Sequence, residues 1–416
     1  MITLEEATAH VLAGCAPRPA RRVARPDAVG CVLAADVRAG EDVPPFANTA
    51  MDGYAVRAAD VASAPVTLPV VAEVAAGHPA PRALQPGEAM RIFTGAPMPE
   101  GADAVVMVEW TERLDGGDRV AIQRPVAPGT HIRPAGDDLR AGEPVFAAGD
   151  HLTPAHVGVL ASLGIDEVAV HPRPRVGVLS TGDELVEGPR PLRPGEIRDS
   201  NRPTLLALVA RSGFEAVDLG TAPDDEGAIT AALRRGVETC DAVLSSGGVS
   251  MGDADLVKVV LDRMGDMRWM QVAIRPAKPL AFGTVRPPEG PPVPVFGLPG
   301  NPVSSMVSFE LFARPGIRRL AGHPDHRLHR ARLAAVADEP LTRKPDGKVH
   351  FARVTVAVDG DGVLRVRPSG GQGSHQLGAM AKADGLAVLP DGEGVPAGGR
   401  VRVILLDEVL GSSAAP

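Results

Sequence analysis

Three short glycine-rich loops carry the residues best suited to chemistry in this sequence. They are STGDE at 180–184, SSGGVSMGDAD at 245–255 and GLPGNPVS at 297–304. Glycine lets a backbone approach an anion closely, Ser and Thr hydroxyls add donors, and a following helix contributes free N–H groups. The three loops together therefore indicate a ligand that carries phosphate.

Carboxylates stand in the same loops, although a carboxylate repels phosphate directly. Glu184, Asp253 and Asp255, with Asp225 at the start of a predicted helix, are explained if a hard cation such as Mg²⁺ lies between them and the phosphate. The alternative is ordinary structure, in which glycines make tight turns and Asp or Ser caps a helix. One loop alone leaves that alternative open, whereas three loops favour the ligand.

A short basic segment and three polar loops complete the candidates. Arg275-Pro276-Ala277-Lys278-Pro279 holds two cations between rigid prolines, which suits a small oxyanion, or else it is a solvated turn. The loops AMDGYA at 50–55, TGAP at 94–97 and RPAGDD at 133–138 each resemble a turn when taken alone. None of these three loops predicts a function by itself.

The glycine-rich loops must be held by an alternation of strands and helices. Apolar runs at 175–180, 214–220, 240–246 and 293–298 predict strands, and helical periodicity is found near 201–212, 226–238, 253–264 and 302–314. Such alternation predicts a mostly parallel sheet that is covered on both faces and binds ligands beyond the carboxyl ends of its strands. All three loops follow predicted strands.

The remaining sequence predicts smaller parts. Residues 3–14 form an amphipathic helix that starts at Thr3 and stops at Gly14, and residues 151–163 form another behind Thr153-Pro154. Short valine-rich runs between about 30 and 170 predict a β-rich module, and alternation after about 325 predicts a small β domain.

Composition limits the function. The chain has 416 residues with 43 Lys plus Arg against 51 Asp plus Glu, so its net charge of −8 argues against a nucleic-acid partner. Three widely separated cysteines fit neither a disulfide framework nor a zinc site. No apolar run approaches the ~18 residues of a membrane span. We therefore expect a cytoplasmic protein with no membrane partner.

Seven motifs in order resemble molybdopterin molybdenumtransferases, the family that includes the C-terminal domain of gephyrin. They are AMDGYA at 50–55, IFTGAPMPEGADAVV at 92–106, RPAGDD at 133–138, STGDEL at 180–185, DSNRP at 199–203, SSGGVSMGDAD at 245–255 and GLPGNPVS at 297–304.

The resemblance implies a multidomain fold of α/β plus β class. It divides into an N-terminal linking and dimer domain at 1–45 and 140–172, an inserted β-rich domain at 46–139, an α/β molybdopterin-binding domain with a mostly parallel sheet at 173–324, and a small C-terminal β-barrel-like domain at 325–416.

The resemblance also implies a reaction. Molybdate would be inserted into adenylylated molybdopterin with Mg²⁺ as cofactor and with release of AMP. The enzyme would be a homodimer whose clefts lie between the α/β domain of one subunit and the β-rich module of the other, and a molybdopterin adenylyltransferase is a possible further partner.

The site residues implied by the resemblance fall into three groups. Catalysis is assigned to Asp52, Asp138, Glu184, Asp225 and Asp255, and metal binding to Glu184, Asp225, Asp253 and Asp255. Substrate binding is assigned to Thr94, Arg133, Thr181, Gly182, Asp183, Ser200, Asn201, Ser246, Gly247, Gly248, Ser250, Gly252, Asp253, Arg275, Lys278, Pro299, Gly300, Asn301, Pro302 and Ser304. Within this set Arg275, Lys278 and Ser246 are the expected molybdate contacts.

Four positions depart from the family pattern, and the first is Arg275, which stands where Lys is usual and keeps the charge. Ala277 replaces a usual glycine in the basic segment, Asp137 precedes Asp138 where Glu is common, and Asp384 stands where Asn is usual. Two other functions stay open, namely a molybdopterin adenylyltransferase and a non-catalytic pterin-binding scaffold. The sequence lacks the GGTG loop of the first, and it keeps six acidic residues that the second does not need.

Overall fold

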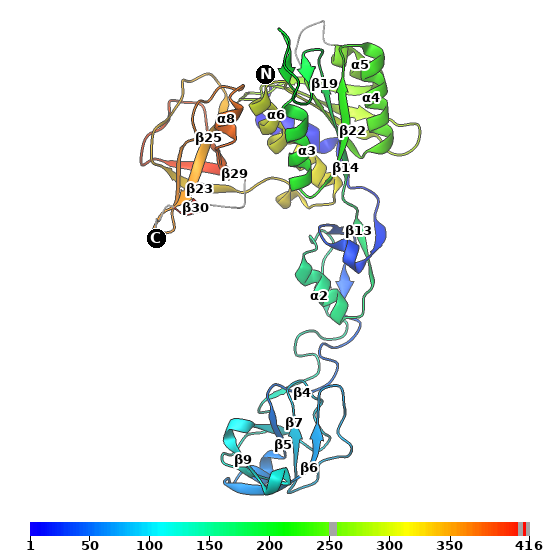
Figure 1. The fold of residues 1–416 in the computed structure, drawn as a ribbon, viewed down its shortest axis with the longest axis vertical. Helices are drawn as coiled ribbons and strands as arrows, with labels where there is room; N and C mark the ends of the chain where they lie inside the picture. Colours follow the sequence, from blue (N-terminus) through cyan, green and yellow to red (C-terminus); the bar gives the residue numbers. More distant parts are fainter. Residues whose placement is uncertain (249–255, 407–410, 413–416) are drawn as a thin grey trace.

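The computed structural model describes residues 1–248, 256–406 and 411–412 of an elongated molecule. The α/β part and a β-barrel lie side by side at one end of the long axis, a β-rich module lies at the other end, and a small linking part joins them (Figure 1). The multidomain α/β plus β class expected from the sequence is confirmed.

The α/β part is built on a six-stranded sheet. Its strand order is β17 (Glu215–Ala222), β14 (Arg175–Thr181), β18 (Ala242–Ser246), β22 (Val293–Leu298), β21 (Pro279–Val285) and β19 (Gly265–Gln271). The first four strands are parallel, as the alternating pattern predicts. The last two pair antiparallel and were not expected. Strand β19 is only partly buried and lacks the continuous apolar run of the central strands, whereas β21 is mostly buried like them and differs only in its antiparallel direction.

Helices cover both faces of this sheet. The elements are α1 (Leu4–Ala13), α3 (Asn201–Arg211), α4 (Glu226–Thr239), α5 (Leu256–Met264), α6 (Pro302–Ser308), a π-helical turn at Phe309–Ala313, and α7 (Arg314–Leu320). Apolar residues of α3, α6 and α7 pack in one core, and those of α4 and α5 pack in the other. Helix α1 joins the first core through Leu4, Ala7 and Val11. Its start is capped as expected, because Thr3 Oγ1 accepts the Glu6 N–H at 3.1 Å.

The linking part contains two small sheets and one α-helix. Its elements are β1 (Arg21–Ala24), β2 (Val32–Leu33), β3 (Val37–Arg38), β12 (Pro144–Phe146), α2 (Pro154–Ser162) and β13 (Glu167–His171). Strand β13 pairs with β1 and β2, and β3 pairs with β12. The chain thus enters and leaves the β-rich module through neighbouring antiparallel strands.

The β-rich module has a six-stranded sheet and a short two-stranded ribbon. The sheet order is β8 (Ala104–Met107), β5 (Gly53–Val56), β7 (Ala89–Ile92), β6 (Val66–Val74), β10 (Arg119–Ile122) and β9 (Thr111–Leu114), and β11 (Ile132–Arg133) pairs with β4 (Asn48–Thr49). Two apolar clusters fill this module with its own residues. It therefore has cores separate from that of the α/β part.

The C-terminal part is a closed five-stranded barrel. Its strands are β23 (Arg332–Ala337), β25 (Val349–Val358), β26 (Leu364–Pro368), β27 (Gly385–Leu389) and β29 (Arg400–Leu405), and closure comes from pairing of β25 with β27. Shorter elements are β24 (Leu341–Thr342), α8 (Leu377–Met380), β28 (Gly394–Val395) and β30 (Gly411–Ser412). Strand β20 (Ile274–Arg275) of the basic segment adds to β25, so the barrel is joined to the α/β part by main-chain pairing.

Among the described residues, no helix combines the length and the apolar character that crossing a bilayer requires.

Candidate active site

The three glycine-rich loops meet at one edge of the α/β sheet. Strands β14, β18 and β22 are adjacent and parallel, so their carboxyl ends lie together. The Gly247 N–H donates to Leu298 O at 3.2 Å, and a Cβ on Gly300 would lie 3.9 Å from the Gly247 Cα. Gly247 has φ +94° and Gly248 has φ +67°, conformations that favour glycine. Close packing of these loops therefore depends on glycine at Gly247.

Asn201 ties two of these loops together. Its Nδ2 donates to Ser246 Oγ at 2.8 Å and to Gly300 O at 2.7 Å. The neighbouring Ser200 occupies the N-cap position of α3 without a side-chain cap bond. The Asp199 carboxylate caps the helix instead, because its Oδ1 accepts the Asn201 and Arg202 N–H groups at 3.1 Å each. Within the DSNRP motif, Asn201 thus contacts the glycine-rich loops, and Asp199 caps the helix that carries Asn201.

The third loop leads into α6 through two prolines. Pro302 stands in the first turn, where it loses no helical hydrogen bond, and Asn301 makes no side-chain cap. One of the free N–H groups of the helix is already used, because the Val303 N–H donates to Ser374 O at 3.1 Å. The 369–376 loop of the barrel part therefore lies against the start of α6, where Ser304 is buried.

The acidic residues of the first loop lie at its exposed rim. The Glu184 carboxylate lies over Gly182, since a Cβ on Gly182 would be 2.4 Å from Glu184 Oε2. The Asp224 N–H donates to Asp183 Oδ1 at 3.0 Å, and the Asp225 Oδ1 accepts the Ala228 N–H at 2.8 Å. Asp183 and Asp225 thus stabilise the loop and the start of α4, while Thr181 is buried below them.

Only two of the four predicted Mg²⁺ ligands, Glu184 and Asp225, lie within the described structure. Asp253 and Asp255, with Ser250 and Gly252, lie outside the described residues. Within the described ranges no group of three or more His, Cys, Asp or Glu side chains could hold a metal ion. Glu184 and Asp225 supply the oxygen donors that Mg²⁺ prefers, but these two alone do not form a metal site.

The basic segment reaches the same edge of the sheet. Ala281 pairs with Gly297, so the start of β21 lies where β22 ends, and Lys278 stands directly before it. Arg275 and Lys278 are exposed, whereas Ala277 is buried with φ +75°. Ala277 therefore adopts the left-handed conformation that glycine adopts at least steric cost.

A cavity of about 480 Å³ lies elsewhere in the α/β part, while one of about 430 Å³ adjoins the basic segment. Residues from the barrel, among them Arg343, His350 and Gln372, line the second cavity together with Arg275. Burial lowers the pKa of His350 despite its contact with Asp346. The sequence pattern did not indicate Arg343 and His350, because the alternation of the strands around them reports only the barrel core.

The polar loops of the β-rich module gather around β4. Asp52 Oδ1 accepts both the backbone N–H and the hydroxyl of Thr94 at 2.7 Å each. Arg133 of β11 pairs with Asn48 of β4, and the Gly95 N–H donates to Thr49 O at 2.9 Å. The structure thus brings Asp52, Thr94 and Arg133 to one end of the module.

Asp138 lies at the neck of this module, and Asp52 is held as an anion. The Asp138 N–H donates to Val43 O at 2.9 Å. The backbone N–H and then the hydroxyl of Thr94 hold the pKa of the Asp52 carboxyl below its usual value. Both carboxylates are exposed.

Within one chain these two groups of residues lie in different parts of the molecule. Strand β5, which follows Asp52, belongs to the lower module, and β14, which precedes Glu184, belongs to the upper part, with β13 and α2 between them (Figure 1). A single chain therefore does not bring Asp52 and Glu184 together.

Comparison with known proteins assigns the family. Residues 2–164 match the MoeA N-terminal region (domain I and II), residues 177–319 a probable molybdopterin binding domain, and residues 334–406 the MoeA C-terminal region (domain IV). A crystal structure of the molybdopterin biosynthesis moeA protein from Pyrococcus horikoshii OT3 superposes with a TM-score of 0.80 at 30% identity, covering 97% of this chain and 100% of that one. The fold is thus that of a molybdopterin-biosynthesis protein.

Curated relatives identify the family within the molybdopterin-biosynthesis proteins. Molybdopterin molybdenumtransferase 2 of Mycobacterium tuberculosis is 43% identical over 376 residues, which cover 88% of this chain and 89% of the relative. Molybdopterin molybdenumtransferase of Haemophilus influenzae is 37% identical over 418 residues, covering 99% and 100%. The chain belongs to the molybdopterin molybdenumtransferase family and is an enzyme of this kind.

Proposed function

We propose that this enzyme inserts molybdate into adenylylated molybdopterin and releases AMP in a Mg²⁺-dependent reaction in the cytoplasm. The observation that carries the proposal is the meeting of three glycine-rich loops with a basic segment at one sheet edge. The relatives named molybdopterin molybdenumtransferase support the proposal that molybdenum is the metal transferred. A molybdopterin adenylyltransferase is the class of partner that would supply the adduct.

Each group of residues has a separate task in this proposal. The N–H groups of the glycine-rich loops position the phosphate chain, and Asn201 keeps the second and third loops in register. Arg275 and Lys278 attract molybdate, a dianion, to the same edge. Mg²⁺, when bound with Glu184, Asp225, Asp253 and Asp255, would neutralise charge on the pyrophosphate.

The proposal includes a homodimer. In one chain the Asp52, Thr94 and Arg133 side chains end on the β-rich module, far from the glycine-rich loops. A second copy that places its β-rich module against this sheet edge would supply the opposite wall of the cleft, with Asp138 at its neck. Two equivalent clefts would result from a two-fold axis.

The decisive experiment supplies purified adenylylated molybdopterin and follows AMP release by chromatography. We expect release to require both Mg²⁺ and molybdate, and the product to activate an apo-molybdoenzyme. Glu184→Gln should lower the rate by ~10²-fold or more, because it removes the anionic oxygen at the rim of the first loop. Glu238→Gln, which removes a charge from the exposed end of α4, serves as the matched control.

Three outcomes would overturn the proposal. They are AMP release at the same rate without molybdate, full activity in the presence of a Mg²⁺ chelator, and formation of the adduct from ATP and molybdopterin by this enzyme. The last result would identify an adenylyltransferase.

A further inference from the structure

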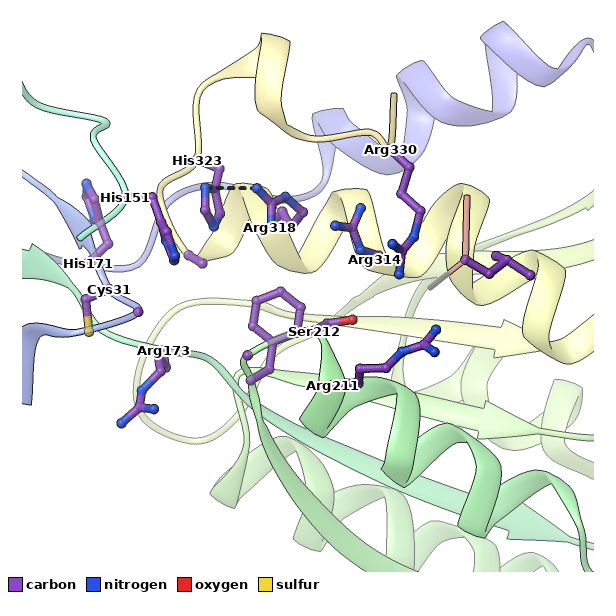
Figure 2. A pocket seen from close by; sticks show the side chains of 15 residues that line it. Cys31, His151, His171, Arg173, Arg211, Ser212, Arg314, Arg318, His323 and Arg330 are labelled. Carbon is purple, nitrogen blue, oxygen red and sulfur yellow. Dashed lines mark hydrogen bonds between the residues drawn. The ribbon is translucent and has the colours of Figure 1, made fainter. Parts of the chain in front are cut away.

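A cationic cavity lies at the sheet edge opposite the glycine-rich loops. Helix α3 begins at Asn201 beside these loops and ends at Arg211, and the helical run from α6 through α7 likewise leads away from them to Leu320. The far ends of these helices line a cavity of about 480 Å³ together with residues of the linking part (Figure 2). It is therefore separate from the proposed active site.

The charges around this cavity are one-sided. Among the described residues that line it, five are arginines and none is acidic: Arg173, Arg211, Arg314, Arg318 and Arg330. Among the described residues, the carboxylate in contact with this cluster is that of buried Glu310, which accepts from Arg330 Nε at 2.7 Å and lies 3.8 Å from Arg211 and 3.9 Å from Arg314. This one carboxylate therefore lies near three guanidinium groups.

Burial and mutual repulsion disfavour the charges of this cluster. Burial lowers the pKa of Arg318 to about 10, with a further contribution from Arg314 and Arg330. Burial also lowers the pKa of Arg314, and Arg330 adds to the effect. Both side chains stay charged at neutral pH, so their repulsion persists unless an anion offsets it.

Histidine donors complete the wall. Burial and the neighbouring Arg318 lower the pKa of His323 to about 3, so its imidazole is neutral at pH 7. Its Nδ1 accepts from Arg318 Nη2 at 3.2 Å, which leaves the proton on Nε2. His323 stacks with His151 at a centroid distance of 5.5 Å, and Figure 2 shows both beside Arg318 along the cavity.

Two buried nitrogens at this cavity have no hydrogen-bond partner within the described part of the chain. They are Arg314 Nε and His151 Nδ1. A buried donor without a partner destabilises the folded state. The unsatisfied Arg314 N–H and the crowded positive charge of Arg314, Arg318 and Arg330 at the same cavity point to a missing anion.

We propose that this cavity binds a small polyanion that carries two or more phosphate or comparable tetrahedral oxyanion groups. Planar guanidinium groups match the oxygens of phosphate in paired hydrogen bonds. The volume exceeds the need of one tetrahedral anion, and the arginines are distributed along the cavity rather than gathered at one point. Because the linking part, the α/β part and the segment leading to the barrel all contribute side chains, such a ligand braces three parts of the molecule.

Inorganic pyrophosphate is a suitable probe, with the metal chelator EDTA present and ionic strength held constant. Calorimetric titration of the full-length protein should give saturable binding that is at least ~10-fold tighter than that of inorganic phosphate, since more guanidinium groups are engaged. Pyrophosphate should also raise the unfolding temperature. Arg211→Gln and Arg330→Gln should each weaken pyrophosphate binding by ~10-fold or more, and Arg211→Lys less than Arg211→Gln.

Two controls separate this cavity from other cations. Arg234→Gln removes an exposed charge from α4, and Lys278→Gln removes a cation from the opposite sheet edge. Both should leave the tight pyrophosphate binding unchanged. Arg211 is half exposed, so its variants test the proposal even if Arg330→Gln fails to fold. Absence of saturable binding, equal affinity in the Arg211 variants, or equal loss in the Lys278 variant would overturn it.

Discussion

Asn201 couples two loops that are far apart in the sequence. The hydrogen bonds of its amide reach Ser246 and Gly300, which follow it by 45 and 99 residues. The same short motif assigns capping to Asp199 and leaves the Ser200 side chain without a cap bond. Adjacent residues of one motif therefore have different physical roles, one in the site and one in the helix.

Asn201→Ala should lower the free energy of unfolding by about 1–3 kcal/mol, because Gly300 O and Ser246 Oγ lose their shared donor. Urea unfolding measures the change. Ser200→Ala is the matched neighbour and should change stability by less than about 0.5 kcal/mol. Equal destabilisation by both substitutions would contradict the assigned bridge.

Thr94→Val should raise the pKa of Asp52 toward its ordinary value, because one of two donors to its carboxylate is removed while the backbone donor remains. A lowered pKa in the folded state stabilises the protein above the pKa of unfolded Asp, and that contribution is lost as pH falls through the folded value. As the pH is lowered, the Thr94→Val variant should therefore lose this stabilising contribution of Asp52 at a higher pH than the wild type does. Carbon-13 NMR titration of the carboxyl, assigned with Asp52→Asn, gives the test, and an unchanged pKa refutes it.

Strand β5 shows why a motif can be fixed by packing as well as by chemistry. A Cβ on Gly53, directly after Asp52, would lie 2.1 Å from Val106 O of the neighbouring strand β8. Backbone cannot yield by that amount without separating the strands. The glycine of AMDGYA therefore lets β5 and β8 approach and keeps Asp52 at the end of the strand.

Gly53→Ala should destabilise the β-rich module by about 1–3 kcal/mol. Gly158→Ala is the control, since nothing lies within 4 Å of a Cβ on this exposed residue of α2. It should stabilise the protein by about 0.5–1 kcal/mol, because glycine in a helix is more costly than alanine. Thermal unfolding of both variants measures the difference, and a shift of the same sign in both would be evidence against the close approach.

The elements that sequence predicts best are those with strong local patterns. The parallel strands have continuous apolar runs, and α1 has Thr3 and Gly14 at its ends, so both follow from local sequence. Strand β19 lacks such a run, and local sequence does not reveal the antiparallel pairing of β21. The position of the glycine-rich loops at one sheet edge can be predicted, because it follows from the topology of parallel strands. The arginine cavity cannot be predicted in this way, because Arg173, Arg211 and Arg330 come together only in the folded chain.

The whole chain is extended, and its proposed reaction cleft requires two copies. The parts that contain Asp52 and Glu184 lie toward opposite ends of the molecule (Figure 1). A homodimer of 43.0 kDa chains, about twice that mass by light scattering, would allow each cleft to combine one part from each copy. A monomer in solution would exclude this arrangement.

Mixing two inactive variants tests the shared cleft directly. Asp52→Asn and Glu184→Gln homodimers should both be impaired, whereas unfolding and refolding them together in equal amounts gives heterodimers with one intact cleft. Activity of the mixture should recover to about a quarter of wild type, because half of the dimers each hold one such cleft. Mixing Asp52→Asn with Asp52→Ala is the control, and failure of the first mixture to exceed it would falsify the shared cleft.

The paired crossing strands at the base of the β-rich module bring its two ends to one point. Strands β3 and β12 run side by side, and Val43 accepts and donates main-chain bonds with the 138–139 segment. If the module were removed at this neck, a short Gly-Ser linker could close the gap, because it would have to span only two adjacent strands. The module that carries Asp52 can therefore be exchanged as a unit, by evolution or by design, which would alter one side of the proposed shared cleft while leaving the α/β sheet and the barrel unchanged.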